Sequence, residues 1–124
     1  MLPATIQGIV TPFSGNGRKL GYPTANLVTQ TQLKDGVYFG FADMAEFVNH
    51  PAIIFIGTPT TVGDKDRRVE AYLLDIPDED YYQQPLKIEL KHYHRQNETF
   101  KDIETLKQIM AQDEALARDW FSKN

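Results

Sequence analysis

The hydrophobic pattern of this chain changes its period once, near Asp102, and that change limits the folds available to it. Before Asp102, apolar residues recur at every second position, most clearly in PLKIELKHYH, where Leu86, Ile88 and Leu90 alternate with charged residues. A period of two places successive side chains on opposite faces of a β-strand. After Asp102 the spacing becomes three to four residues, which is typical of a helix with one apolar side. We therefore expect a long β region followed by one C-terminal helix.

Five segments predict strands, and turn-forming residues separate them. They are ATIQGIV (4–10), GVYFGFADM (36–44), PAIIFIG (51–57), RVEAYLLD (68–75) and PLKIELKHYH (85–94). PAIIFIG is apolar throughout, as expected of a strand that is buried on both faces. Most connections are too short for a crossover helix, which favours antiparallel pairing. Five or six such strands and one helix predict a mainly β fold, a small barrel closed or plugged by that helix.

The predicted helix begins after Asp102, a residue type that caps helix N-termini, and Glu104 in its first turn complements the helix dipole. Its apolar stripe comprises Ile103, Leu106, Met110, Ala117 and Phe121. Asp113 falls on the same side of the helix as this stripe. A carboxylate in that place is either buried and paired with a strand residue, or it contacts a substrate.

Size and composition exclude several classes of protein. The 124 residues are enough for one domain, which we expect to span 1–124. The absence of cysteine excludes disulfides and thiolate metal sites, and a net charge of -4 argues against a nucleic-acid partner. A nucleotide substrate stays open, because a metal ion can neutralise its phosphates. The start resembles no signal peptide, and no apolar stretch approaches the roughly 20 residues of a membrane span, so we expect a cytoplasmic protein with no membrane partner. We also expect a monomer.

The segment SGNGRKLG contains three glycines within seven residues, Gly15, Gly17 and Gly21, together with Arg18 and Lys19. Glycines let backbone N–H groups approach an anion closely, and the two cations add positive charge. The segment matches neither the P-loop nor the dinucleotide fingerprint. It is therefore either a hairpin turn between strands or a cradle for phosphate.

After Tyr22, the four residues PTAN combine a rigid Pro23 with two oxygen-bearing side chains, Thr24 and Asn26. Residues two apart in an extended segment point to the same side. Hydroxyl and amide oxygens suit a Mg²⁺ ion that shares the phosphates of a substrate. The alternative is a capped turn, in which Asn26 bonds only to the backbone.

Glu70 and two histidines are further candidates for chemistry. Glu70 lies in the middle of a predicted strand, where it either accepts a proton from a substrate hydroxyl or faces water. His92 and His94 share one strand face, which suits zinc, but a third ligand with recognisable spacing is missing, so an exposed strand end is the simpler interpretation.

The connection between the last strand and the helix contains Arg95, Glu98 and Phe100. An aromatic ring can stack on a planar ligand, and an arginine can pair with a phosphate. Such a loop can equally serve only to attach the helix to the barrel.

In this order, the segments resemble the riboflavin kinase (flavokinase) family over almost the whole chain. The resemblance rests on LGYPTANL, GVYFG, FIGTPT, VEAYLLD, DYYQQPL, RQNETF and LKQIMAQD, of which GxPTAN is the most specific. It implies a six-stranded antiparallel, Greek-key-like barrel with a C-terminal helix. It also implies ATP-dependent phosphorylation of riboflavin to FMN, with Mg²⁺.

The resemblance assigns roles residue by residue. It implies that Glu70 is the general base, and that Thr24 and Asn26 bind Mg²⁺ and the phosphates, Asn26 as part of the catalytic centre. The nucleotide-binding residues that it implies are Gly15, Gly17, Arg18, Lys19, Gly21, Pro23 and Thr24. The flavin-binding residues that it implies are Arg95, Asn97, Glu98 and Phe100.

The chain departs from the family pattern at several loops. Phe13 and Gln83 stand where the family usually has glycine, Asn97 stands at a usual glutamate with Glu98 one place later, and IGTPT is one residue short. No FMN adenylyltransferase domain accompanies these residues, so FAD synthesis is not expected. Two other hypotheses stay open, a non-catalytic flavin- or nucleotide-binding sensor or carrier, and a kinase that phosphorylates a different small alcohol.

Overall fold

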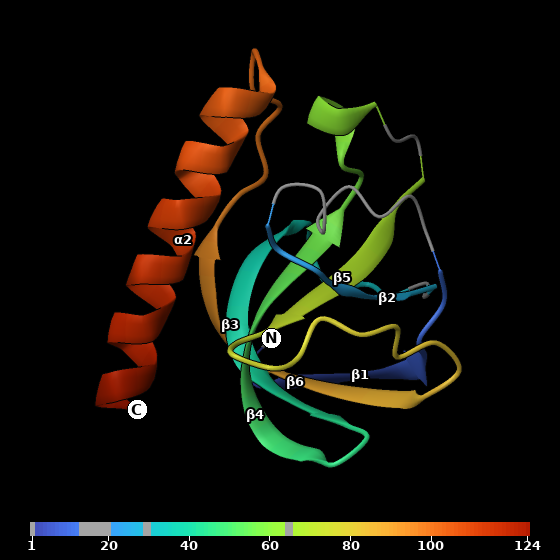
Figure 1. The fold of residues 1–124 in the computed structure, drawn as a ribbon. Coiled ribbons are helices and arrows are strands. Elements are labelled where there is room, and N and C mark those ends of the chain that lie inside the picture. The colour runs from blue at the N-terminus through green and yellow to red at the C-terminus, as the bar shows by residue number, and fades with distance from the viewer. Residues whose placement is uncertain (1, 13–20, 29–30, 64–65) are drawn as a thin grey trace.

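A computed structural model describes residues 2–12, 21–28, 31–63 and 66–124. In these residues, six strands are followed by one long helix, with a short 3₁₀ turn between the fourth and fifth of these strands (Figure 1). The elements are β1 (Ala4–Ile9), β2 (Ala25–Leu27), β3 (Gly36–Met44), β4 (Phe47–Gly57), η1 (Thr60–Val62), β5 (Arg68–Leu73), β6 (Pro85–Arg95) and α2 (Ile103–Lys123). The expected order of strands and helix is confirmed. The alternation pattern missed β2, because three residues are too few to show a period.

The six strands form one antiparallel sheet in the order β1-β6-β3-β4-β5-β2. The sheet curls until its edge strands approach each other (Figure 1). There, Thr11 N–H, just after β1, donates a 2.9 Å hydrogen bond to the carbonyl of Asn26 in β2. The result is a curled half-barrel rather than a fully paired barrel.

The concave face of the sheet holds the main core. In β4, Ala52, Ile54 and Ile56 are fully buried in this core. Ile53 and Phe55, which alternate with them, are only half-buried and point to the other face. The prediction that PAIIFIG is buried on both faces is therefore wrong for the second face, because that face borders a cavity.

Helix α2 lies outside the sheet and does not plug the barrel, which corrects the expectation from the sequence (Figure 1). Near its end, Trp120 and Phe121 pack on the outward-facing rings of Phe39 and Phe41, with ring centroids 6.0 Å apart for Phe39–Trp120 and 5.5 Å apart for Phe41–Phe121. The side chains of the sheet already fill the interior, so the helix covers the outer face instead. Ile103, predicted to begin the apolar stripe, is 41% exposed.

The start of α2 follows the sequence prediction. Asp102 is the N-cap, and its Oδ1 accepts a 2.7 Å hydrogen bond from Thr105 N–H. Glu104 lies in the first turn, where its charge complements the helix dipole. Among the residues that the structure describes, no helix is long and apolar enough to cross a membrane.

Candidate active site

The strand register brings distant candidate residues into one row. Asn26 in β2 pairs with Glu70 in β5, and Glu70 pairs with Phe55 in β4. Directly paired residues of adjacent antiparallel strands point to the same face. The row lies opposite the core, because Ala71 and Ile54, which alternate with Glu70 and Phe55, are buried inside.

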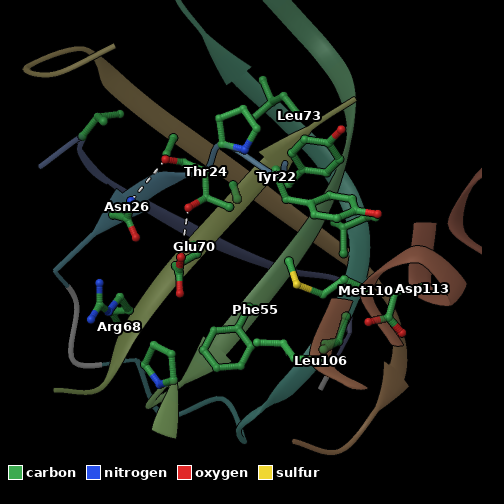
Figure 2. Close-up of a pocket in the computed structure, with 18 of the residues that line it drawn as sticks. Tyr22, Thr24, Asn26, Phe55, Arg68, Glu70, Leu73, Leu106, Met110 and Asp113 are labelled. Atoms are coloured by element: carbon green, nitrogen blue, oxygen red, sulfur yellow. Dashed lines mark hydrogen bonds between the residues drawn. The ribbon is translucent and has the colours of Figure 1, made fainter. Parts of the chain in front are cut away.

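A cavity of about 460 Å³ lies over this row, between the sheet, α2 and the surrounding loops. Figure 2 shows two different ends. Thr24, Asn26, Arg68 and Glu70 gather at a polar end, whereas Phe55, Leu106 and Met110 form an apolar end. This volume is in the usual range for a small-molecule site. The cavity can therefore hold a ligand with one polar and one apolar part.

The polar end is organised around the Thr24 hydroxyl, which donates a 2.9 Å hydrogen bond to Glu70 Oε1. The amide nitrogen of Asn26 donates to the Thr24 carbonyl at 3.1 Å (Figure 2). That bond orients Asn26 Oδ1, which is buried without a hydrogen-bond partner among the described residues. The bond from its nitrogen to the backbone matches the capped turn, and its oxygen can accept a hydrogen bond or a metal ion.

Arg68 belongs to the polar end and was not predicted. It is 5% exposed and lies on β5, two residues before Glu70, so both side chains point to the cavity. The alternation in RVEAYLLD contains this information, because position 68 shares the face of position 70.

Asn97 lies in the cavity wall, where its amide nitrogen donates a 2.8 Å hydrogen bond to the Ile56 carbonyl. The close contact of the Asn97 side chain with the β4 backbone requires glycine at position 57, because a Cβ there would collide with the Asn97 amide nitrogen. Asn97 Oδ1 is buried and, within the described part of the chain, has no hydrogen-bond partner. Phe100 N–H donates to Thr61 Oγ1 at 2.9 Å and fixes the other end of the loop.

Arg95 joins the last strand to the helix. Its Nε and Nη2 donate to the two carboxylate oxygens of Asp113 at 2.9 and 2.8 Å, and Nη1 donates to the Gln96 carbonyl. The prediction that Asp113 is buried and paired with a strand residue is confirmed. The predicted flavin residues Arg95, Asn97, Glu98 and Phe100 all line the cavity, but the guanidinium of Arg95 is already held by Asp113.

Among the residues that the structure describes, the two histidines of the last strand have no third ligand with which to hold a metal ion. His94 Nε2 lies 3.0 Å from Asp113 Oδ1, and its ring stacks on Phe39. His92 is exposed and stacks on Trp120. In the described ranges, no three His, Asp or Glu side chains gather where they could hold a metal ion. The exposed strand end predicted for both residues is found for His92 only.

Two tyrosines that the sequence analysis did not select form another part of the wall. The rings of Tyr22 and Tyr72 meet edge to face, with centroids 5.2 Å apart. Burial, and after it the nearby Glu114 carboxylate, raises the pKa of both phenols. Both hydroxyls therefore stay protonated and can donate hydrogen bonds at neutral pH.

Part of the predicted nucleotide loop cannot be compared with the structure. Phe13, Gly15, Gly17, Arg18 and Lys19 lie outside the described residues. Gly21 is described, and its φ of +91° is a conformation that glycine adopts without strain. Pro23 lines the cavity beside Thr24.

Comparisons with known proteins identify a family and several relatives. Residues 1–121 match the family model described as flavokinase, riboflavin kinase. The chain is 31% identical over 125 residues to the bifunctional riboflavin kinase/FMN adenylyltransferase of Escherichia coli, covering 96% of this chain and 38% of that protein.

Two solved structures share the fold. One is described as a macrolide-efflux protein from Streptococcus pneumoniae, with a TM-score of 0.79 and 26% identity over 95% of this chain and 39% of that one. The other is riboflavin kinase from Trypanosoma brucei, with a TM-score of 0.72 and 23% identity over 96% of this chain and 77% of that one. The chain spans only part of the relatives that it matches, 19% of the trifunctional protein RibF/MnmA of Mycoplasmoides gallisepticum and 38% of the Escherichia coli protein.

Proposed function

This chain belongs to the riboflavin kinase family, and from that premise we propose that it transfers the γ-phosphate of ATP to the 5′-hydroxyl of riboflavin. The products are FMN and ADP. The observation that carries the proposal is the placement of Glu70 at the polar end of a two-ended cavity, hydrogen-bonded to Thr24.

Glu70 is the general base in this proposal. The ribityl oxygen attacks the γ-phosphorus, the bond from that phosphorus to the β,γ-bridging oxygen breaks, and the hydroxyl proton passes to the Glu70 carboxylate. The Thr24 hydroxyl holds one carboxylate oxygen and so orients the other toward the acceptor. A well-placed base contributes about 10²–10⁴-fold to such a reaction.

Thr24 and Asn26 fit a site for Mg²⁺. Asn26 Oδ1 is a buried acceptor without a hydrogen-bond partner in the described part of the protein, and the Thr24 hydroxyl is a second hard oxygen from the same segment. When bound, Mg²⁺ would neutralise charge on the ATP phosphates. Gly15, Gly17, Arg18, Lys19, Gly21 and Pro23 stay predicted nucleotide-binding residues.

The apolar end suits the flavin ring. Phe55, Leu106 and Met110 offer apolar surface to a planar heterocycle, and Phe100, in the loop that follows β6, adds an aromatic face. In the same proposal, Asn97 and Glu98 contact the polar edge of the ring. Arg95 contributes by holding this loop to α2 through Asp113.

The test is FMN formation from riboflavin and Mg-ATP, measured by HPLC with fluorescence detection. We expect the wild type to form FMN and Glu70→Gln to be slower by about 10²–10⁴-fold. Glu89→Gln is the matched control, because Glu89 lies on β6, contacts Lys91 and does not line the cavity. Tight flavin binding without turnover would instead support the sensor or carrier hypothesis, and turnover with another alcohol only would support the third.

We also expect this chain to act as a cytoplasmic monomer that uses ATP and riboflavin as its small-molecule partners and binds neither nucleic acid nor membrane. Light scattering coupled to size exclusion measures the oligomeric state directly. A mass near 14.2 kDa is the expected result.

A further inference from the structure

Arg68 is a buried cation at the polar end of the cavity. Among the described residues, the only buried side chains with a formal charge are Arg68 and Asp113. The burial of the Asp113 carboxylate is explained by its pairing with Arg95. Arg68 lines the cavity, and Figure 2 shows it near Asn26 and Glu70.

A guanidinium keeps its charge at every physiological pH, so its burial is costly unless an anion lies near. Arg68 also interacts with other groups of the chain. Its position on β5 places it on the same face as Glu70, about 7 Å away along the strand. This is close enough for a phosphoryl group positioned for attack at Glu70 to meet the guanidinium.

The charges at the polar end of the cavity also favour a phosphate group beside Arg68. Thr24 and Asn26, the two oxygen donors that fit a metal ion, are both neutral, and the proposed base Glu70 is an anion. Arg68 is therefore the cation among the four residues that form this end. A triphosphate brings several negative charges, and phosphoryl transfer depends mainly on positioning and on neutralising that charge. A planar guanidinium binds phosphate through two parallel hydrogen bonds, which adds orientation to charge.

We propose that Arg68 binds the γ-phosphoryl group of the nucleotide while it passes to the acceptor oxygen. This inference rests on the proposed kinase activity and adds a residue to it. Thr24 and Asn26 would hold the phosphates from the β2 side, and Arg68 would hold them from β5. The bonds made and broken are those already given for the transfer.

The experiment compares Arg68→Gln and Arg68→Lys with Arg67→Gln. Arg67 is the matched control, because it is the adjacent arginine, donates to Asp35 and to the carbonyls of Thr31 and Leu33, and does not line the cavity. We expect Arg68→Gln to lower kcat about 100-fold and Arg68→Lys about tenfold, since lysine keeps the charge but loses the planar fork. Riboflavin affinity, measured by flavin fluorescence, should stay within twofold in both variants.

A second measurement separates this inference from the proposed function. Calorimetry with tripolyphosphate and Mg²⁺ requires no turnover, and we expect Arg68→Gln to weaken binding at least tenfold while Arg67→Gln binds as the wild type does. If the wild type forms no FMN, the kinase proposal fails and this binding result alone decides the role of Arg68. Should Arg68→Gln fail to fold, Arg68→Lys decides in the same way. Arg68 variants that keep both kcat and tripolyphosphate affinity within threefold of the wild type would overturn the inference. A loss of kcat and affinity that is explained entirely by a lower melting temperature of the variant would overturn it as well.

Discussion

Thr24 Oγ1 donates a 2.9 Å hydrogen bond to Glu70 Oε1, across 46 residues of sequence. The bond exists because β2 pairs with β5 in a register that sets Asn26 opposite Glu70. It joins a residue of the specific PTAN segment to the proposed base. The proposed nucleotide-binding segment and the proposed base are therefore joined by a direct hydrogen bond.

The first prediction concerns this bond. Thr24→Val keeps the shape of the side chain but removes the hydroxyl that donates to Glu70. A hydrogen bond to a charged group is worth about 1.5–3 kcal/mol, so we expect kcat for FMN formation to fall at least tenfold. Thr24→Ser keeps the hydroxyl and should retain most of the activity. Equal activities for the two variants would contradict the role given to this hydroxyl.

The second prediction concerns the attachment of helix α2. Asp113→Ala removes the carboxylate that accepts two hydrogen bonds from Arg95 and leaves a partly buried guanidinium unpaired. We expect the free energy of unfolding, measured by urea denaturation, to fall by about 3 kcal/mol. Asp119→Ala is the control on the same helix, because Asp119 is exposed and pairs only with Lys123 at 3.0 Å among the ion pairs of the described residues. A loss no larger than that of the control would show that the pair contributes little.

The third prediction concerns backbone strain at Gln83, one of the positions where the chain departs from the family pattern. Gln83 stands where the family usually has glycine, and its φ is +69°, a conformation that is unfavourable for side chains with a Cβ. Its backbone N–H donates a 2.9 Å bond to the Val10 carbonyl, which holds this turn in place.

We expect Gln83→Gly to raise the free energy of unfolding by about 0.5–1 kcal/mol, since the relief of strain exceeds the added freedom of the unfolded chain. Gln84→Gly is the matched control and should lower stability, because residue 84 does not have a positive φ. Urea denaturation of the two variants measures the difference. Stabilisation by both substitutions, or by neither, would argue against strain at position 83.

The fourth prediction concerns pH. Hydrogen bonds from Arg118, at 2.8 and 3.0 Å, hold the pKa of Asp75 below its usual value of 3.8. A carboxyl whose pKa is lower in the folded state stabilises the protein fully above its usual pKa, and this contribution is lost as pH falls through the lowered value. We expect Asp75→Asn to cost less than about 1 kcal/mol at pH 7, because the pair is exposed, and to cost less at pH 2 than at pH 7.

Asparagine is the appropriate substitution there, since residue 75 has a φ of +61° and asparagine tolerates that conformation. Urea denaturation at pH 7 and at pH 2 compares the two proteins. A difference between them that persists unchanged at pH 2 would show that the charge of Asp75 is not its cause.

Local features of the sequence determined much of this protein. The alternation in PLKIELKHYH, the capping residue Asp102 and the apolar spacing after it predicted strands and helix close to their observed bounds. These features could be predicted because each depends on neighbours a few residues away. The PTAN segment and Glu70 could be selected as candidates for the same reason, since residue type and spacing are local.

Only the tertiary structure decided how those parts meet. It set Asn26, Glu70 and Phe55 in one row, placed α2 outside the sheet, and put a cavity over the face that Arg68 shares with Glu70. It also gave Arg95 its partner Asp113, 18 residues away in the helix. Such relationships depend on the register between strands that are distant in sequence and on which face remains uncovered once the core is filled. No short window of sequence contains that information, because the free energy that selects one register comes from the packing of the whole sheet.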